Sequence, residues 1–376
     1  MRSSKLIKDA ALAAGADACG IAPITRMKGA PDEMNPMFLF PEAKSMIGFV
    51  FRIPRGVQRG IEEGTQFYQY PSKANGGINE IFAPAVLYSV GKVIEDEGYE
   101  AFVYRNTGAR GCVSDMDGSP GNTLSPEEQI EVNENAKTST AHHRNVQFTR
   151  ATREDNVPPD LQFQFRLAAV ACGLGEIGWS KMLLTPEFGP LQRVAFIFTD
   201  AEFDTYDEMY NGEPLCRKCG ACVRECPGGC IPAINSGHTV RVDIEGKISE
   251  WGDIDMWRCY AFYTHAGRYY NPFVPKEVWD KNENGSLDLM EGVTDVADEK
   301  EIMKVYTALQ KYFPSWVGYN MAKCGGCIRA CVSMLEKKGG CMEDRFKEPL
   351  RNRKKAWRLD RLWKSIYMTE KILKPF

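Results

Sequence analysis

The sequence predicts a mixed α/β (α+β) fold in two domains, the second of which is built around metal-binding cysteines. Three observations predict it. The chain has 376 residues, of which 43% are hydrophobic, enough for a large core and two domains. Helix-type and strand-type hydrophobic patterns alternate through most of residues 1–205. Five cysteines then fall in the stretch "LCRKCGACVRECPGGC", residues 215–230.

The first domain, residues 1–205, is predicted to begin with an amphipathic helix that carries Leu6, Ala10, Leu12 and Ala13 along one side. The strand "DACGIAPI" follows, and "AKSMIGFVFRI" is a second strand. Residues 81–104 indicate a helix, a glycine turn and another strand. Later in the domain, "LQFQFRLAAVACGLG" is predicted as a helix that stops at Gly173, and "QRVAFIFTD" as a strand.

Residues 105–160 interrupt these patterns with a long polar, turn-rich stretch. It contains one plausible helix start, at residues 125–128 with the sequence "SPEE". A connection of this length inside a compact domain is usually functional or disordered. We therefore expect an active-site loop region over 105–160.

The second domain, residues 206–344, contains two sets of closely spaced cysteines. The first set has the spacing C-x2-C-x2-C-x3-C followed by Pro227, which is the bacterial ferredoxin pattern whose fourth cysteine serves a second [4Fe–4S] cluster. The motif "KCGGCIRAC" supplies the second set. A structural zinc site needs only four ligands and fits less well. The eight expected ligands are Cys216, Cys219, Cys222, Cys226, Cys259, Cys324, Cys327 and Cys331.

The other five cysteines are expected to be ordinary thiols. Cys19, Cys112 and Cys172 lie in apolar or loop contexts, whereas Cys230 and Cys341 are near the predicted clusters but exceed the eight ligands, and we expect them to pack.

Charge and hydropathy indicate which partners and which cellular compartment to expect. The net charge is −3, so the chain as a whole is not expected to bind polyanions. No window approaches the ~20 apolar residues that span a bilayer. The N-terminus is too polar for a signal peptide and lacks a twin-arginine signal. We therefore expect a cytoplasmic protein without a transmembrane segment, where clustered cysteines usually bind metal.

Residues 345–376 form a basic C-terminal helix or tail with eleven Lys and Arg against three acids. Trp357, Trp363, Ile366 and Tyr367 recur at near-helical spacing. The segment is predicted to pack this stripe on the core, and docking to tRNA, an anionic membrane surface or an acidic electron donor is the alternative.

The segment "GLGEIGWSKMLLTPEFGPLQRVAFIFTD", together with the ferredoxin motif after it, resembles the reductive dehalogenase and epoxyqueuosine reductase superfamily. The opening "LIKDAALAAGADACGIAP" is similar to the start of that family. The resemblance is strong over residues 173–227, where it is closer to reductive dehalogenases, and weak over 105–160.

The resemblance implies a nitroreductase-like core that binds a cobamide, and a ferredoxin-like domain that reduces its cobalt. It implies that Cys216, Cys219, Cys222 and Cys331 bind one cluster and that Cys226, Cys259, Cys324 and Cys327 bind the other. None of the four histidines lies in the D-x-H-x-x-G pattern, which fits a base-off cobamide without a histidine ligand. The positions expected against the corrin are Gly173, Gly175, Phe198, Thr199 and Asp200, for which a helix C-cap and a strand end are the structural alternative.

The reacting site needs a proton donor and a cation beside the departing anion. Arg193 stands where reductive dehalogenases commonly carry arginine, although a structural ion pair is the alternative. Asp160 is the first candidate acid, or else the N-cap of the following helix. His142, in the sequence "HHR", is the second because histidine titrates near neutrality. Tyr260, and with it Tyr263, is the third, since it adjoins Cys259.

The sequence therefore predicts a cobamide-dependent reductase that takes electrons from an external ferredoxin or flavodoxin through two [4Fe–4S] clusters. Its expected reaction is reductive removal of a leaving group, of dehalogenation type, from a small organic substrate. One alternative is an epoxyqueuosine reductase that acts on tRNA. Reductive dehalogenases use a tyrosine in the region before the glycine turn, so the absence of any tyrosine between Tyr104 and Tyr206 favours that alternative. Arg193 counts against it. The other alternative is a non-catalytic electron-transfer or corrinoid-carrier protein.

Overall fold

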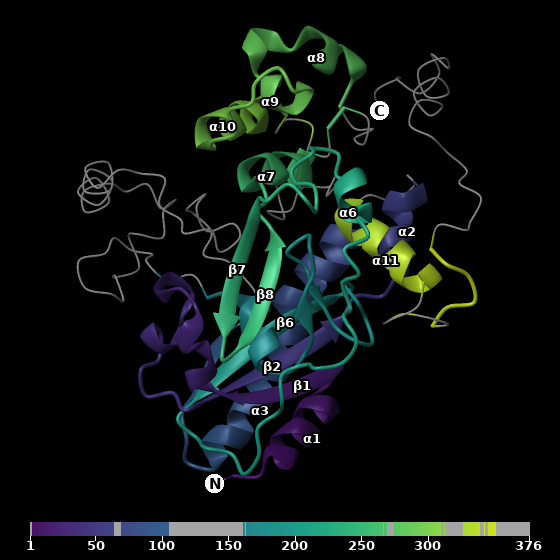
Figure 1. The fold of residues 1–376 in the computed structure, drawn as a ribbon. Coiled ribbons are helices and arrows are strands. Elements are labelled where there is room, and N and C mark those ends of the chain that lie inside the picture. Colours follow the sequence, from purple (N-terminus) through teal and green to yellow (C-terminus); the bar gives the residue numbers. More distant parts are fainter. Residues whose placement is uncertain are drawn as a thin grey trace, which may run out of the picture. The chain divides into compact units, whose positions relative to one another are not determined.

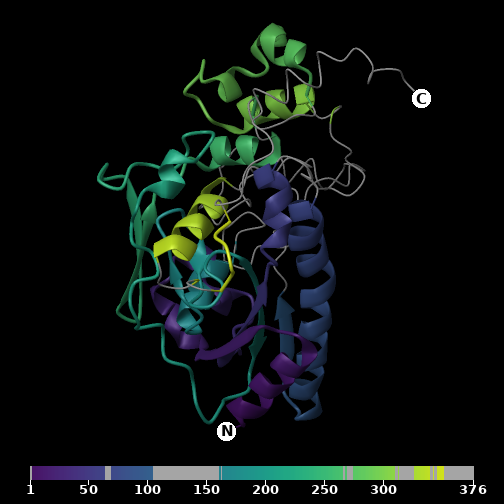
Figure 2. The same ribbon diagram turned by 90° about the vertical axis from the view of Figure 1, so that its right-hand side faces the viewer.

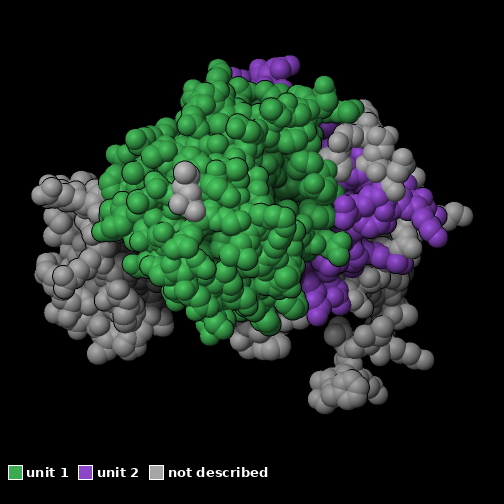
Figure 3. Space-filling view, turned by 90° about the horizontal axis from the view of Figure 1, so that it is seen from below, with its two compact units in different colours: residues 1–52, 78–218, 239–251 green, residues 53–77, 219–238, 252–376 purple. Residues whose placement is uncertain are grey.

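The computed structural model describes residues 2–63, 69–104, 161, 163–265, 267–268, 274–309, 312, 326–338, 342 and 345–350. The chain divides into two compact units, each made of separate segments. Unit 1 comprises residues 1–52, 78–218 and 239–251, and unit 2 comprises 53–77, 219–238 and 252–376; Figure 3 gives them different colours. Both helices and strands are present, which confirms the predicted mixed class.

A four-stranded antiparallel sheet forms the centre of unit 1, with the strand order β1-β2-β6-β3. Figure 1 shows β2 between β1 and β6. The strands are β1 (Ala18–Pro23), β2 (Ser45–Arg52), β3 (Ala101–Tyr104) and β6 (Gln192–Thr199). All eight residues of β2 except Arg52 are buried, because the sheet is covered on both faces.

Helices cover the two faces of this sheet. On one face α3 (Ala83–Asp96) packs against β3 and β6, and α1 (Ser4–Ala14) packs against α3, as Figure 2 shows. On the other face α5 (Phe165–Ala171) packs in a core with Phe196 and Phe198 of β6. Phe163 contacts both rings edge-on, at centroid distances of 5.1 and 5.0 Å.

The buried side of α1 differs from the expected one, so that part of the prediction is wrong. Ser4, Ile7 and Ala11 are buried, whereas Leu6 and Leu12 are 49% and 50% exposed. The buried residues follow the i, i+3, i+7 spacing of one helix face. A serine begins this stripe, and its hydroxyl is satisfied by a 2.6 Å hydrogen bond with Thr205 Oγ1, so hydrophobicity alone selected the wrong face.

The remaining elements of unit 1 are short. Three 3-10 helices, η1 (Ile24–Gly29), η2 (Asp32–Met34) and η3 (Pro36–Phe38), follow β1. The hairpin of β4 (Glu176–Ile177) and β5 (Leu183–Leu184) precedes β6, and β7 (Thr239–Ile244) and β8 (Lys247–Gly252) form another two-stranded sheet. The π-helix η4 (Pro71–Phe82), which begins in a segment of unit 2 and ends in unit 1, leads into α3.

Unit 2 is helical in its described part. Its helices are α2 (Gly56–Glu63), α6 (Ala221–Arg224), α7 (Met256–His265), α8 (Lys276–Lys281), η7 (Glu283–Gly285), α9 (Asp288–Glu291), α10 (Glu299–Leu309) and α11 (Gly326–Lys338). One core joins α7, α8, α9 and α10 around the buried side chains of Phe262, Trp279 and Leu289. Among the described residues, every helix is too short or too polar to cross a bilayer.

Candidate functional site

The ferredoxin-type run winds through a tight loop and one short helix. Lys218 and Gly220 both have positive φ, 46° and 70°, and turn the chain sharply on either side of Cys219. The helix α6 then carries Cys222, and the chain leaves it toward Cys226 and Pro227. Of these cysteines Cys219 is exposed, and the others are half-buried. Thiols on a loop that reverses direction between them can face a common centre, as cluster ligands must.

Cys216 belongs to unit 1, where the β4–β5 hairpin contacts it twice. The Glu176 carboxylate Oε1 accepts a hydrogen bond from the Cys216 N–H at 2.6 Å. The Trp179 N–H donates to the Cys216 sulfur at 3.3 Å. Donation of an N–H to a ligand sulfur is one of the devices by which proteins tune iron–sulfur clusters. Both residues lie inside the motif "GLGEIGW" that marks the sequence resemblance, but sequence reasoning assigned them no role.

In unit 2, Cys226 and Cys259 are brought together around Cys230. The Cys230 thiol hydrogen-bonds the sulfurs of Cys226 and Cys259, and these contacts and burial raise the pKa of Cys230. The same Cys230 thiol and nearby backbone N–H groups lower the pKa of Cys226 to about 6. A lowered pKa favours the thiolate, which is the form that binds metal. Cys230, expected only to pack, therefore contacts two of the expected ligands.

Cys327 and Cys331 lie four residues apart on α11, so they share one face of that helix. This helix packs against α6, which carries Cys222. The approach is close at Gly326, where a Cβ atom would lie 2.5 Å from the Glu225 carbonyl oxygen. Cys324 lies outside the described residues.

Two ion pairs join α11 to the segment around α2. Arg329 Nε lies 2.8 Å from Glu62 Oε2, and the two side chains are 9% and 5% exposed. Arg55 Nη1 lies 2.8 Å from Glu336 Oε1, where the exposed fractions are 19% and 4%. Between Arg55 and Glu62 on α2, Gln58 is fully buried, and neither its Nε2 nor its Oε1 has a hydrogen-bond partner among the described residues.

These observations test whether the chain fits iron–sulfur clusters. Within the described residues no three histidine, cysteine or acidic side chains are placed to hold one metal ion. That result bears on a single-ion site such as zinc, whereas a cluster spreads its ligands around a larger body. The thiolate-favouring surroundings of Cys226 and the N–H···S contact to Cys216 both suit cluster ligands. The cysteines therefore fit the ligand requirements of iron–sulfur clusters.

The two glycines expected to face a corrin are both needed for the protein's own packing. Gly173, with φ +74°, follows the C-cap of α5, and a Cβ there would lie 2.3 Å from the Glu208 carbonyl oxygen. Gly175 has φ +151°, and a Cβ there would lie 2.0 Å from the Leu184 carbonyl oxygen. These contacts explain both glycines without a cofactor.

The three expected positions at the end of β6 also have internal contacts. Phe198 and Thr199 are fully buried, and Thr199 Oγ1 accepts the Ala201 N–H at 3.1 Å. Asp200 accepts the N–H of Glu100 at 2.9 Å. These contacts account for the three positions without a corrin, and a cobamide is implied by the sequence resemblance.

Arg193 is half-buried near the start of β6, opposite Phe51 of β2. It lies seven residues from Asp200 along the strand, which corresponds to roughly 23 Å at the rise of an extended chain. The structure therefore does not bring Arg193 together with the expected corrin positions at the other end of β6.

The expected proton donors are divided between described and other residues. Tyr260 lies on α7, where burial, then Tyr306 and Tyr263, raise its pKa to about 12. Its phenol therefore keeps its proton at neutral pH. Asp160 and His142 lie outside the described residues, as do the whole loop region 105–160 and most of the basic tail.

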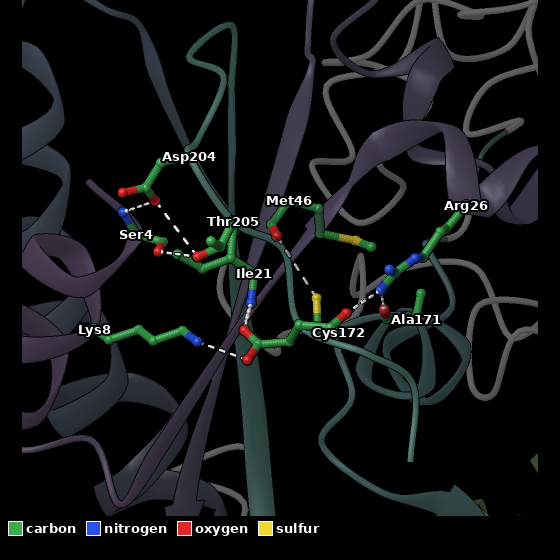
Figure 4. Close-up of polar contacts among 10 residues, drawn as sticks. Ser4, Lys8, Ile21, Arg26, Met46, Ala171, Cys172, Asp204 and Thr205 are labelled. Carbon is green, nitrogen blue, oxygen red and sulfur yellow. Dashed lines mark hydrogen bonds and ion pairs between the residues drawn. The ribbon is translucent and has the colours of Figure 1, made fainter. Parts of the chain in front are cut away.

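A polar network that the sequence did not suggest supports the glycine turn before β4. Arg26 is only 8% exposed, and its Nη1 donates to the carbonyl oxygen of Ala171 at 2.8 Å (Figure 4). The same nitrogen donates to the carbonyl oxygen of Asp207. The Asp207 carboxylate in turn accepts from Lys8 Nζ at 2.6 Å and from the Ile21 N–H at 2.7 Å. The network joins the end of α5 to the segment that leads to Cys216.

Two thiols lie beside this network, the half-buried Cys19 and the buried Cys172. Burial, the largest effect, raises the pKa of Cys19 to about 12 and also raises that of Cys172. The Cys172 sulfur faces the Met46 carbonyl oxygen at 3.7 Å, as Figure 4 shows. Both thiols are therefore uncharged at neutral pH.

Comparison with curated proteins identifies reductive dehalogenases as relatives, whereas no family model matches the chain. Over 158 residues, 40% of the chain, the sequence is 30% identical to tetrachloroethene reductive dehalogenase from Desulfitobacterium hafniense strain Y51. The enzyme of the same name from Sulfurospirillum multivorans is 29% identical over 121 residues, 30% of the chain. These matches confirm the predicted resemblance to a superfamily of oxidoreductases. The matched segments amount to 27% and 24% of the length of these relatives.

Solved structures of both predicted enzyme types overlap the chain at low identity. A catabolic reductive dehalogenase in complex with 3-bromo-4-hydroxybenzoic acid has a TM-score of 0.43 and 14% identity, over 81% of this chain and 34% of that one. An epoxyqueuosine reductase with a tRNA stem loop has a TM-score of 0.39 and 14% identity, over 88% of this chain and 80% of that one.

Proposed function

We propose that the chain is an oxidoreductase of the reductive dehalogenase type. It passes electrons through two [4Fe–4S] clusters to a base-off cobamide. Its reaction removes a leaving group from a small organic molecule. The observation that carries the proposal is the cysteine pattern combined with the sequence match to tetrachloroethene reductive dehalogenases. Under this proposal the core is nitroreductase-like and the cysteine-rich part ferredoxin-like, and an external ferredoxin or flavodoxin supplies the electrons.

Eight cysteines would hold the clusters, in the two groups that the resemblance implies. Cys216, Cys219, Cys222 and Cys331 would hold one, and Cys226, Cys259, Cys324 and Cys327 the other. The contacts of Cys216 and Cys226 support thiolate ligands at these two positions. Because the cysteines must stay reduced until they bind iron, the proposal places the chain in the cytoplasm.

A cobamide, when bound, supplies a strongly reducing cobalt centre. The chain's own part in the reaction is to supply a proton to the carbon that loses its substituent and to stabilise the departing anion. For the first task the candidates are Tyr260, Asp160 and His142; the Tyr260 phenol is protonated at neutral pH, and burial and neighbouring tyrosines raise its pKa further. For the second task Arg193 is the candidate cation.

Turnover under strictly anaerobic conditions tests the proposal. The protein, reconstituted with iron, sulfide and cobalamin, is mixed with a chemical one-electron donor and either tetrachloroethene or a halogenated phenol. We expect chloride or bromide release that requires both metals. Conversion of epoxyqueuosine in tRNA without any halide release would instead establish the tRNA-directed alternative. Cluster reduction without turnover of either kind would leave an electron-transfer protein.

A further inference from the structure

The β4–β5 hairpin carries a carboxylate to the backbone of one expected cluster ligand. Glu176 opens the hairpin and accepts the Cys216 N–H at 2.6 Å, while Trp179, three residues later, donates its N–H to the Cys216 sulfur at 3.3 Å. One short segment therefore fixes both the main chain and the thiol of this cysteine. Trp179 itself is 2% exposed, so its backbone is anchored by a buried ring.

The hairpin is held rigidly by contacts that involve no cofactor. Gly175 lies so close to the Leu184 carbonyl oxygen that a Cβ atom would be 2.0 Å from it. Gln192 Nε2 donates to the Leu183 carbonyl oxygen at 2.8 Å, and the Gly178 N–H donates to the Met182 carbonyl oxygen at 2.9 Å. Contacts within the protein therefore fix the position of Glu176, as a group that tunes a metal site requires.

Two charged side chains, Glu176 and Lys218, lie close to Cys216. Among the described residues Glu176 forms no ion pair, and its contact is the Cys216 N–H. Lys218, two residues after Cys216, forms an ion pair in which its Nζ lies 2.6 Å from Glu250 Oε1. The same Nζ lies 5.3 Å from the centre of the Trp179 ring. A negative charge close to a cluster disfavours the added electron, and a positive charge favours it.

We propose that Glu176 is a positioning residue that lowers the reduction potential of the cluster bound through Cys216, and that Lys218 opposes it. This inference rests on the proposed function, since it presupposes a cluster at Cys216. A lower potential makes that cluster a stronger electron donor. The two charges thereby set the driving force for electron transfer out of one cluster without being ligands themselves.

The test is a redox titration of the anaerobically reconstituted full chain, followed by the electron paramagnetic resonance of the reduced clusters. Glu176→Gln keeps a carbonyl oxygen for the Cys216 N–H but removes the charge. We expect the midpoint potential of one cluster to become more positive and that of the other to stay unchanged. Glu42→Gln removes the same charge from an exposed position of unit 1, and both of its midpoints should equal those of the wild type.

Lys218→Met gives an independent measurement with the opposite sign, because it removes a positive charge. We expect the same midpoint to become more negative. Unchanged midpoints in both variants, or shifts in the same direction, would overturn the proposal. If Glu176→Gln failed to assemble its cluster, the sign of the shift in Lys218→Met would decide. Absence of clusters from the wild-type protein is a different result, since it would refute the proposed function itself.

Discussion

The ion pair between Arg329 and Glu62 is the contact whose removal we expect to destabilise unit 2 most clearly. It joins α11, which carries Cys327 and Cys331, to α2. Replacing Arg329 by Met preserves the length of the side chain but removes its charge. The Glu62 carboxylate would then remain in place at 5% exposure without the guanidinium that now lies 2.8 Å away.

The size of the effect follows from this burial. Breaking a buried pair by removing one partner costs about 3–5 kcal/mol, because the remaining buried charge loses the opposite charge beside it. An exposed pair contributes about 0–1 kcal/mol. Lys5 and Asp9 on α1 form such a pair, with side chains 82% and 58% exposed, so Lys5→Met is the matched control. Replacing both buried partners, as Glu62→Leu with Arg329→Met, should restore most of the lost stability.

Equilibrium unfolding in urea, monitored by circular dichroism on the reduced, cofactor-free chain, measures the four proteins. We expect Arg329→Met to lower the free energy of unfolding by about 3–5 kcal/mol, and Lys5→Met by less than about 1 kcal/mol. A loss for Arg329→Met as small as that of the control would contradict this prediction, because it would mean that the buried Glu62 carboxylate does not depend on the Arg329 guanidinium.

Three further predictions concern single residues. Gly175→Ala should lower the free energy of unfolding by at least about 1–3 kcal/mol in the same urea assay, because its Cβ would lie 2.0 Å from the Leu184 carbonyl oxygen at a φ of +151°; wild-type stability would contradict the tight turn. Gln58→Met should raise that free energy by about 1–3 kcal/mol, because it removes buried amide atoms that have no hydrogen-bond partner in the described part of the chain; a loss of stability would contradict this explanation. Burial lowers the pKa of His265 from 6.5 to about 4, so the unfolded chain binds more protons between these values. Stability should therefore be full above pH 6.5 and fall by up to about 3 kcal/mol toward pH 4, and His265→Gln should abolish this part of the slope in urea titrations over that range.

The sequence predicted those elements whose hydrophobic pattern is dictated by the sheet. The strands at 45–52 and 192–199 are buried on both faces and appear as nearly continuous apolar runs, which are easy to recognise. The predicted face of α1 was wrong because a serine with a buried hydrogen bond lies on the true face. Each unit is assembled from three separate segments of the chain. That division depends on contacts between residues far apart in the sequence, which a local hydrophobic pattern does not contain.

The candidate site divides in the same way. Ligand cysteines have a characteristic spacing, because the loop must wrap a cluster of fixed size, so they could be identified from the sequence. Glu176, Trp179 and Arg26 could not, because their roles are carried by backbone contacts to Cys216 and Ala171. Gly173 and Gly175 were expected to face a corrin, but the close approach of neighbouring carbonyl oxygens already explains why both positions are glycine.

The metal content of the full chain, purified and reconstituted under anaerobic conditions, decides whether the protein holds two [4Fe–4S] clusters and a cobamide. We expect about eight irons, eight acid-labile sulfides and one cobalt per chain, with little zinc. Cys226→Ala should lose iron, whereas Cys230→Ala should keep about eight, because Cys230 is not among the expected ligands. Zinc in place of iron in the wild-type protein would contradict the account, and iron without any cobalt would contradict its cobamide.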